Sequence, residues 1–197
     1  SHRLIGIKGS RGVGKTTFAM SVAKSIGRKF AKISLGGMYD TAELIGHRKT
    51  YIGSNPGKII TSLIKVKTSN PIILLDEVDK LSRDYRGDPA STLLDVLDKT
   101  SNNKFVDNYI EEEVDLSKVF FILTANDKTN IPPALYDRLE VIELSGYTDL
   151  EKIHIAKNHL IPQIIKSYNK RNKNIDISDQ SLMYLIECYT KESGVRD

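Results

Sequence analysis

The sequence predicts an α/β fold in which a parallel β-sheet lies between two layers of helices and is followed by an all-helical lid. Short aliphatic runs, each of the length of one strand, alternate with stretches of helical periodicity over residues 1–146. The run at 72–75 is aliphatic throughout, which is typical of a strand buried on both faces of a parallel sheet. After residue 146 only helical periodicity continues. We therefore expect a three-layer core over residues 1–146 and an incomplete helical lid over residues 147–197.

The first half of the core is expected to begin with a βαβ unit. Its predicted elements are a strand at 4–8, a helix from Lys15 to about Gly27, and a strand at 30–35. Such a unit implies parallel strands with a right-handed crossover. A short helix at 41–45, a loop bounded by glycines at 46–57 and a helix at 58–67 follow.

The second half of the core continues the alternation and leads into the lid. The strand at 72–75 is followed by a helix that begins with Asp88 as N-cap and Pro89 in its first position. The remaining elements are predicted as a hairpin ending near 116, strands at 119–124 and 141–144, a short helix opening at 131–133, and lid helices at 149–160, 161–168 and 178–189.

The composition is that of an ordinary globular protein. The 197 residues are 40% hydrophobic and 27% charged, enough for one full core and a smaller second one. Net charge is +4, but the basic residues are scattered among 25 acidic ones, which gives only weak support for DNA as a partner. No apolar run approaches membrane length and no leader opens the chain, so we expect no membrane partner. The single cysteine, Cys188, cannot form an internal disulfide and favours a reducing compartment.

A phosphate-binding loop is predicted between the first strand and the first helix. The stretch fits G-x-x-x-x-G-K-[ST] with Gly9, Ser10, Arg11, Gly12, Val13, Gly14, Lys15 and Thr16. The glycines let successive backbone N–H groups converge, and the helix that follows adds its positive N-terminal end. We expect Lys15 to contact the β- and γ-phosphates of a polyphosphate and the Thr16 hydroxyl to hold Mg²⁺.

Polar residues follow two of the buried strands, at the edge of the sheet where ligands of α/β proteins bind. Asp76 and Glu77 follow the strand at 72–75, and Asn126 follows the strand at 119–124. Asp76 is expected to orient the water shell of Mg²⁺, and Glu77 to polarise an attacking water. Asn126 could hydrogen-bond both the γ-phosphate and that water. These residues predict a site that hydrolyses a phosphoanhydride.

Two further features lie outside this cluster. Arg138 immediately precedes a strand and is not expected to reach its own phosphate loop, which suggests a finger supplied to a neighbouring subunit. The alternative is a salt bridge to Asp137 or Glu140. Tyr51 and Ile52 stand in the middle of the loop at 46–57, and the residue types alone favour packing into a local core.

The ordered set of these motifs resembles the AAA+ ATPases and, more narrowly, the ATPase module of Lon proteases. The narrower resemblance covers nearly the whole chain and rests on residues 34–37, 46–53, 74–77, 86–91, 137–138, 145–148 and 193–196. It implies binding of ATP or ADP with Mg²⁺.

The resemblance also assigns roles to individual residues. Lys15 and Thr16 correspond to Walker A, Asp76 and Glu77 to Walker B, Asn126 to sensor 1, Arg138 to the arginine finger and Arg196 to sensor 2. It identifies Tyr51 and Ile52 with the family's pore loop, which grips unfolded polypeptide, and thereby favours exposure over local packing. Tyr147 and Ile155 correspond to positions that flank the adenine.

For function, the resemblance implies an ATP-hydrolysing module of an ATP-dependent serine protease. Such a protein unfolds damaged or misfolded proteins and moves them to a protease chamber, as a homohexameric ring in the bacterial cytoplasm or, alternatively, the mitochondrial matrix. The family's Ser-Lys protease domain has no counterpart in this sequence, so we expect no peptidase activity here.

One departure from the family and two alternative functions remain. Ser10 and Arg11 stand where the family usually has two prolines, which loosens the loop and adds a positive charge near the phosphates. The chain could instead be a nucleic-acid-acting AAA+ ATPase, such as a helicase loader, with Arg48 and Lys49 on phosphate. It could also be inactive in isolation, because Arg138 has no neighbour in a monomer.

Overall fold

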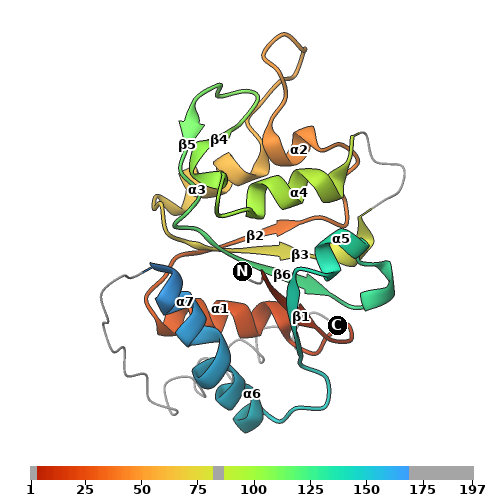
Figure 1. Ribbon diagram of the computed structural model, residues 1–197, viewed down its shortest axis with the longest axis vertical. Helices are drawn as coiled ribbons and strands as arrows, with labels where there is room; N and C mark the ends of the chain where they lie inside the picture. The colour runs from red at the N-terminus through yellow and green to blue at the C-terminus, as the bar shows by residue number, and fades with distance from the viewer. Residues whose placement is uncertain (1–3, 82–86, 169–197) are drawn as a thin grey trace.

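The computed structural model describes residues 4–81 and 87–168 and places a five-stranded sheet between two layers of helices (Figure 1). All the strand pairs in this sheet are parallel. In spatial order the strands are β2 (Phe30–Ser34), β3 (Ile72–Asp76), β6 (Phe120–Ala125), β1 (Leu4–Lys8) and β7 (Leu139–Glu143). The α/β class and the parallel sheet predicted from the sequence are confirmed.

Helices cover both faces of this sheet, as Figure 1 shows. One face carries α1 (Lys15–Ser25) and the helical segment formed by α6 (Asp149–Ile155), η4 (Ala156–Leu160) and α7 (Ile161–Tyr168). The other carries α2 (Ala42–Ile45), α3 (Lys58–Val66) and α4 (Pro89–Leu97). The shorter elements are η1 (Val78–Lys80), η2 (Asn102–Lys104), the antiparallel pair β4 (Phe105–Val106) and β5 (Glu113–Val114), η3 (Lys128–Asn130) and α5 (Pro133–Tyr136).

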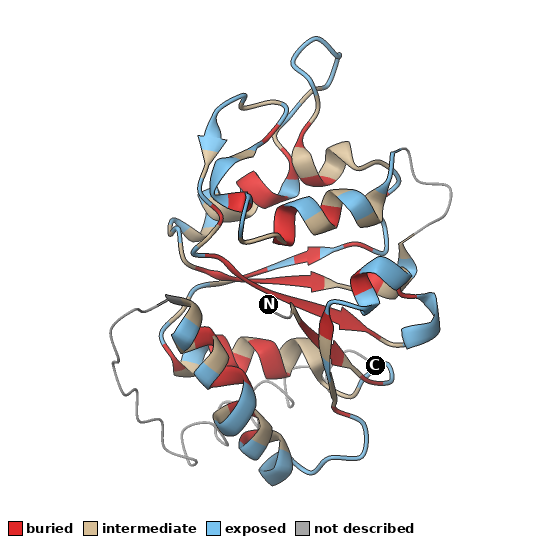
Figure 2. Cartoon of the chain, viewed as in Figure 1, coloured by how far each residue is buried: buried red, intermediate tan, exposed pale blue. Residues whose placement is uncertain are grey.

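The hydrophobic core is divided by the sheet into two clusters, one under each helical layer. Figure 2 shows that buried residues fill the central strands and the inward faces of the helices. Strand β6 is buried along its whole length and β3 is buried up to its last residue, Asp76. The side chains that end these strands therefore start from fixed positions.

The N-terminus of α4 is as predicted. Asp88 is the N-cap, its carboxylate accepts a hydrogen bond from the Ser91 backbone N–H at 3.1 Å, and Pro89 opens the helix. A cap of this kind satisfies one of the N–H groups that have no partner within a helix.

The segment 149–168 differs from the prediction of two helices over 149–160 and 161–168, which is wrong. It is a single continuous helix whose middle turn, η4, is a π-turn, and the residues at both junctions keep right-handed helical dihedrals. Pro162 explains the wide turn, because its ring would clash with the carbonyl four residues earlier in a regular α-helix. The helix begins with Thr148 as N-cap, whose hydroxyl oxygen accepts from the Glu151 N–H at 3.2 Å.

Ile153, Ala156 and Leu160 of this helix pack into the same cluster as Phe18 and Val22 of α1. The helix at 149–168 is therefore joined to the sheet through α1. The helix expected at 178–189, with Cys188, lies outside the described residues. None of the helices described combines the length and apolarity needed to cross a bilayer.

Candidate nucleotide-binding site

The loop between β1 and α1 has backbone conformations that favour glycine at several positions. Gly12 and Gly14 have φ of +82° and +88°, the left-handed region that disfavours side chains. A Cβ on Gly9 would lie 2.6 Å from the Val13 Cγ1, whereas the space around Gly12 is open. The first N–H groups of α1 have no side-chain cap, and no acidic residue lies in its first turn. This geometry is compatible with the anion cradle that the sequence predicts.

Lys15 is folded back into this loop. Its Nζ donates to the carbonyl oxygens of Gly9 at 2.8 Å and Ser10 at 3.1 Å, and to Asn126 Oδ1 at 2.7 Å. Burial lowers the pKa of Lys15 from its ordinary value, and the carboxylates of Asp76, Asp79 and Glu77 act in the opposite direction. The structure thus brings together Lys15 and Asn126, which are 111 positions apart in the sequence.

Thr124, near the end of β6, connects Asp76, the last residue of β3, with Glu77, which follows it. Its hydroxyl donates to Asp76 Oδ1, and the same oxygen accepts from the Glu77 backbone N–H at 3.1 Å. Glu77 has a φ of +62°, unusual for a residue with a side chain, and its carboxylate forms an ion pair with Lys80 at 3.0 Å. The backbone of Glu77 is thus fixed by its bond to Thr124, while its carboxylate is paired with the side chain of Lys80.

Asp79 orients the end of β6. One of its oxygens, Oδ2, accepts from the backbone N–H groups of Asn126 and Asp127, each at 3.0 Å. The other, Oδ1, is buried without a partner among the residues that the structure describes. The sequence argument missed both Asp79 and Thr124. The available signal was their position, because Thr124 ends one predicted strand and Asp79 lies four residues beyond the end of another, and the two strands are neighbours in the sheet.

The helix at 149–168 and the segment before it also contact the loop between β1 and α1. Lys152 Nζ donates to the Val13 carbonyl at 3.2 Å, and the Ser145 hydroxyl oxygen accepts from the Ser10 N–H at 3.2 Å. Ile155 is half-buried and packs on the α1 cluster together with Val13. Tyr147 is 44% exposed, on the turn that precedes the helix. Sequence reasoning singled out Tyr147 and Ile155 but not Lys152 or Ser145.

The residues present fit Mg²⁺ bound together with phosphates, but not a metal held by protein alone. Among residues 4–81 and 87–168 no three His, Cys, Asp or Glu side chains are grouped to hold a metal ion. Mg²⁺ typically takes one or two protein oxygens and completes its shell with water and phosphate. The Thr16 hydroxyl, in the first turn of α1, and the Asp76 carboxylate are oxygen donors of that type.

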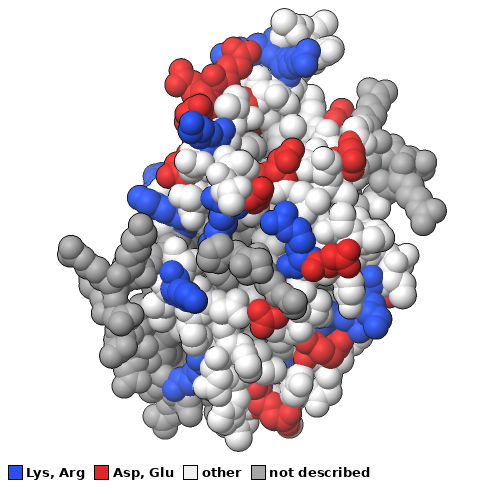
Figure 3. Space-filling view, in the orientation of Figure 1, with Lys and Arg blue, Asp and Glu red and all other residues white. Residues whose placement is uncertain are grey.

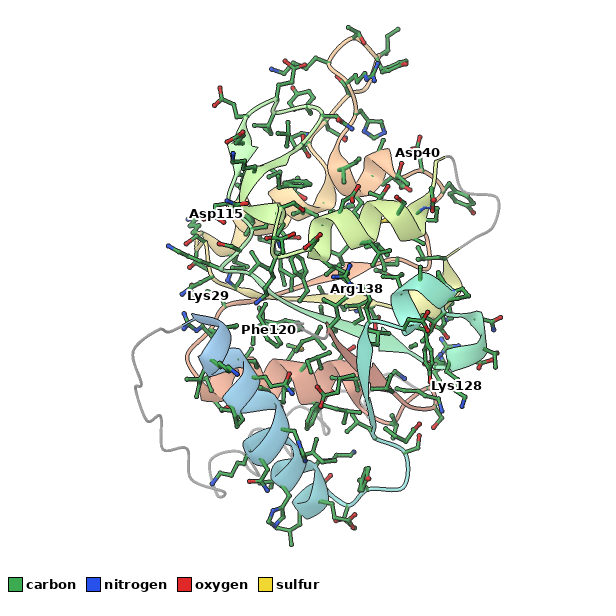
Figure 4. The ribbon with its side chains drawn as sticks, in the orientation of Figure 1. Lys29, Asp40, Asp115, Phe120, Lys128 and Arg138 are labelled. Carbon is green, nitrogen blue, oxygen red and sulfur yellow. The ribbon has the colours of Figure 1, made fainter. Side chains whose placement is uncertain are left out.

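Arg138 lies at the opposite edge of the sheet. Strands β1 and β7 run parallel, with Leu4 beside Leu139 and Lys8 beside Glu143. Arg138 comes just before β7, at the amino ends of the two strands, whereas the phosphate loop comes just after β1, at their carboxyl ends. The four residue steps from Leu4 to Lys8 separate the amino and carboxyl ends of these strands by about 13 Å. Figure 4 shows Arg138 near the middle of the view and Lys128, just beyond the carboxyl end of β6, at its right-hand edge. Arg138 is therefore placed away from the phosphate loop of its own chain.

The surroundings of Arg138 form a hollow of about 740 Å³ at the amino ends of the strands. Arg138 is exposed, and the ion pairs within the described residues, Lys8 with Glu143 and Lys80 with Glu77, do not include it. The alternative of a salt bridge to Asp137 or Glu140 is wrong. The hollow is lined in part by Leu4, Asp98, Lys99, Phe120 and Lys166.

Tyr51 and Ile52 belong to the loop between α2 and α3, which projects at the top of Figures 1 and 2. Tyr51 is 64% exposed and Ile52 is fully exposed, so the local-core interpretation of this pair is wrong. On the face drawn in Figure 3, Lys and Arg are interspersed with Asp and Glu and do not form one continuous basic surface. Arg196 lies outside the described residues.

Comparison with known families agrees with this site. The model of the ATPase family associated with various cellular activities (AAA) matches residues 5–147. The chain belongs to this family. Membership of an ATPase family makes it a nucleotide-binding, ATP-hydrolysing module.

The narrower resemblance is confirmed by individual relatives, all of them Lon proteases. The chain is 57% identical over 188 residues to the Lon protease of Rickettsia bellii, an alignment that covers 95% of this chain and 24% of the relative. It is 53% identical over 194 residues to that of Malacoplasma penetrans and 51% identical over 193 residues to Lon protease 1 of Bacillus subtilis, each covering 98% of this chain and 25% of the relative. The chain spans about a quarter of the length of these curated relatives.

Proposed function

We propose that this chain is the motor of an ATP-dependent serine endopeptidase, a module that uses ATP to unfold damaged or misfolded proteins and move them toward a protease chamber. The observation that carries the proposal is the gathering of Lys15, Asp76, Glu77 and Asn126 at one edge of the sheet, around an open glycine loop. The similarity to Lon proteases supports the assignment of polypeptide as the substrate. We infer a bacterial cytoplasmic location from the bacterial sources of the relatives.

The chain's own residues would divide the hydrolytic work as follows. Lys15 would exchange its contacts with the loop carbonyls for the β- and γ-phosphates. Glu77 would release Lys80 and orient a water in line with the γ-phosphate, while Asn126 would hydrogen-bond the same phosphate. Mg²⁺, when bound, would neutralise charge that develops on the phosphates, with Thr16 and Asp76 as the residues that hold it. Tyr147 and Ile155 would flank the adenine.

Arg138 would complete the site of a neighbouring copy. Its distance along the sheet from its own phosphate loop supports a contribution in trans, as does its lack of an ion pair among the described residues. In comparable systems such an arginine accelerates hydrolysis by ~10³–10⁵. We propose a hexameric ring as the assembly, with residues 1–146 as core, 147–197 as lid, and Arg196 of the lid contacting the nucleotide. The exposed Tyr51 and Ile52 would grip polypeptide in its centre.

Two inactive variants, mixed, test the shared site. In the ring-forming protein, Glu77→Gln should bind ATP with native affinity but hydrolyse it at least about 100-fold more slowly, because the general base is lost. Arg138→Ala should bind ATP equally well and be at least as slow. Mixed rings contain some interfaces with an intact Glu77 facing an intact Arg138. Steady-state hydrolysis by the mixture should therefore exceed the sum of its parts.

The matched control is Arg28→Ala mixed with Glu77→Gln, because Arg28 follows the C-terminal end of α1, whereas the phosphate loop precedes its N-terminal end. Its mixture should show only the activity of its diluted Arg28→Ala component. Normal hydrolysis by Glu77→Gln would refute the catalytic assignment. Two inactive parents whose mixture stays inactive although mixed rings form would refute the action of Arg138 in trans.

A further inference from the structure

The loop that carries Tyr51 and Ile52 is closed at its base by two glycines, Gly46 and Gly57. Their backbones lie so close that a Cβ on Gly57 would approach the Gly46 nitrogen to 2.5 Å. Just above this base the His47 N–H donates to the Asn55 carbonyl at 3.2 Å. The hydrogen bonds that the structure gives to residues 48–54 are short-range, such as Tyr51 N–H to the Arg48 carbonyl at 3.1 Å. One further contact leaves the loop: Lys49 Nζ lies 5.6 Å from the centroid of the Tyr109 ring, in the turn that follows β4. The direction in which the tip projects is therefore set by the base of the loop and by this turn.

A buried carboxylate from a distant turn holds this base. Asp107, which follows β4, is completely buried. Its Oδ2 accepts from the Gly57 N–H at 2.8 Å, and its Oδ1 accepts from the N–H groups of Tyr109 at 2.8 Å and Ile110 at 3.0 Å. Three backbone donors compensate the cost of burying this charge. Two of them build the local turn, whereas the third belongs to the projecting loop, 50 positions earlier.

The neighbouring residue, Asn108, holds the other side of the base. Its backbone N–H donates to the Ile45 carbonyl at 2.8 Å, and its Nδ2 donates to the Gly46 carbonyl at 3.2 Å. Gly46 has a φ of +92°, and a Cβ there would collide with the Asp107 carboxylate. Both ends of the projecting loop are thus bonded to consecutive residues of one turn.

We propose that Asp107 is a positioning residue, which fixes the direction in which the Tyr51–Ile52 tip is presented to its polypeptide ligand. The part concerning the ligand rests on the proposed function. An aspartate has a specific use at this position. The local turn alone needs one acceptor oxygen, which an asparagine would also supply. The second oxygen serves the Gly57 N–H.

Asp107→Asn separates these two uses because it preserves size. Its single carbonyl oxygen can replace Oδ1 in the turn, but its NH₂ group would face the Gly57 N–H as a second donor. Hydrogen exchange should accelerate by about 10- to 100-fold at the Gly57 and His47 amides, and stay native in β3. Affinity for a fluorescein-labelled, permanently unfolded polypeptide should fall several-fold, while ATP hydrolysis without polypeptide stays unchanged.

The matched control is Asn102→Ala. Asn102 is buried in the same segment and donates through Nδ2 to the Val96 carbonyl at 3.0 Å, but it does not contact the projecting loop. It should lower stability without accelerating exchange at Gly57 or weakening polypeptide binding. Equal loss of binding in Asn102→Ala and Asp107→Asn would reduce Asp107 to a stabilising residue and overturn the proposal. Native exchange at Gly57 in Asp107→Asn would also overturn it.

A milder variant keeps the test available if Asp107→Asn does not fold. Asn108 is exposed, and Asn108→Ala removes only its side-chain bond to Gly46, so it should give a smaller change of the same kind. Failure of the proposed function is distinguishable from failure of this inference. If the native protein does not bind the polypeptide, the proposed function fails, while the exchange rates at Gly57 and His47 still decide whether Asp107 holds the loop.

Discussion

Two loops bounded by glycines, Gly9–Gly14 and Gly46–Gly57, place candidate functional side chains in opposite ways, Lys15 directly after the first loop and Tyr51 and Ile52 within the second. The phosphate loop turns Lys15 inward, where its ammonium contacts two carbonyls and the Asn126 side chain. The projecting loop turns Tyr51 and Ile52 outward, with Ile52 fully exposed. In the first loop the functional side chain itself is held. In the second the base is held by hydrogen bonds to Asp107 and Asn108, and Lys49 lies over the Tyr109 ring, while the Tyr51 and Ile52 side chains stay exposed.

The difference follows from what each loop is expected to contact. Charge neutralisation on a phosphate needs donors within a few tenths of an ångström of their position, which a half-buried lysine held by two carbonyls and an amide can supply. Polypeptides of many sequences need an apolar contact that adapts to each of them. A held base with exposed side chains at the tip meets that need.

The largest effect is expected from the inward side chain. Lys15→Ala should weaken ATP binding by at least about 100-fold, because it removes charge-assisted hydrogen bonds to two phosphates. Calorimetric titration measures this directly. Lys24→Ala, at the exposed far end of the same helix, is the control and should bind ATP as the native protein does. Equal affinities for the two variants would exclude Lys15 from the phosphate site.

A smaller effect is expected from the outward side chains, and at a different ligand. The double change Tyr51→Ala and Ile52→Ala should weaken binding of an unfolded polypeptide by about tenfold. Because both side chains are exposed, the free energy of unfolding should move by no more than about 0.5 kcal/mol. Fluorescence anisotropy and denaturant unfolding give the two quantities. Tyr39→Ala, at another tyrosine 75% exposed, controls for loss of an aromatic surface residue. If that single change weakens binding equally, the projecting loop is not the binding element.

The smallest effect is a pH dependence of ATP affinity. Burial lowers the pKa of Lys15 in the free protein, whereas a bound polyphosphate would raise it by favouring the charged form. Binding is then linked to proton uptake, and affinity should fall as pH rises through the lowered pKa, before the ordinary lysine value of 10.5 is reached. Lys15→Arg stays protonated over this range and should lose the slope. Parallel slopes in the two proteins would assign the pH dependence to another group.

Most of the fold could be predicted from sequence because it depends on local patterns. The strand-length aliphatic runs and the Asp88–Pro89 helix start needed no knowledge of distant residues. The continuous helix through Pro162 could not be predicted in this way. A proline usually marks a boundary, and here the packing of the helix on α1 outweighs that preference by accepting a π-turn.

The residues of the candidate site likewise fall into those that the sequence indicates and those that depend on contacts between distant segments. Lys15 and Asp76 lie in motifs or at strand ends that sequence makes visible. The role of Thr124 depends on β6 lying beside β3, and that of Asp107 on a contact 50 positions away. The exposure of Ile52 was missed by residue type, because an isoleucine is buried only when other chain segments are available to cover it.

The inward contacts of Lys15 also act as a filter on the length of the phosphate chain. A bound ligand must replace the three hydrogen bonds that Lys15 makes within the protein. The net binding free energy from Lys15 is therefore the difference between its contacts with the ligand and those three hydrogen bonds. A triphosphate is expected to reach the ammonium and recover that loss, whereas a monophosphate is expected to recover less of it. We therefore expect the loop itself to favour ATP over AMP, independently of contacts with the base or the sugar.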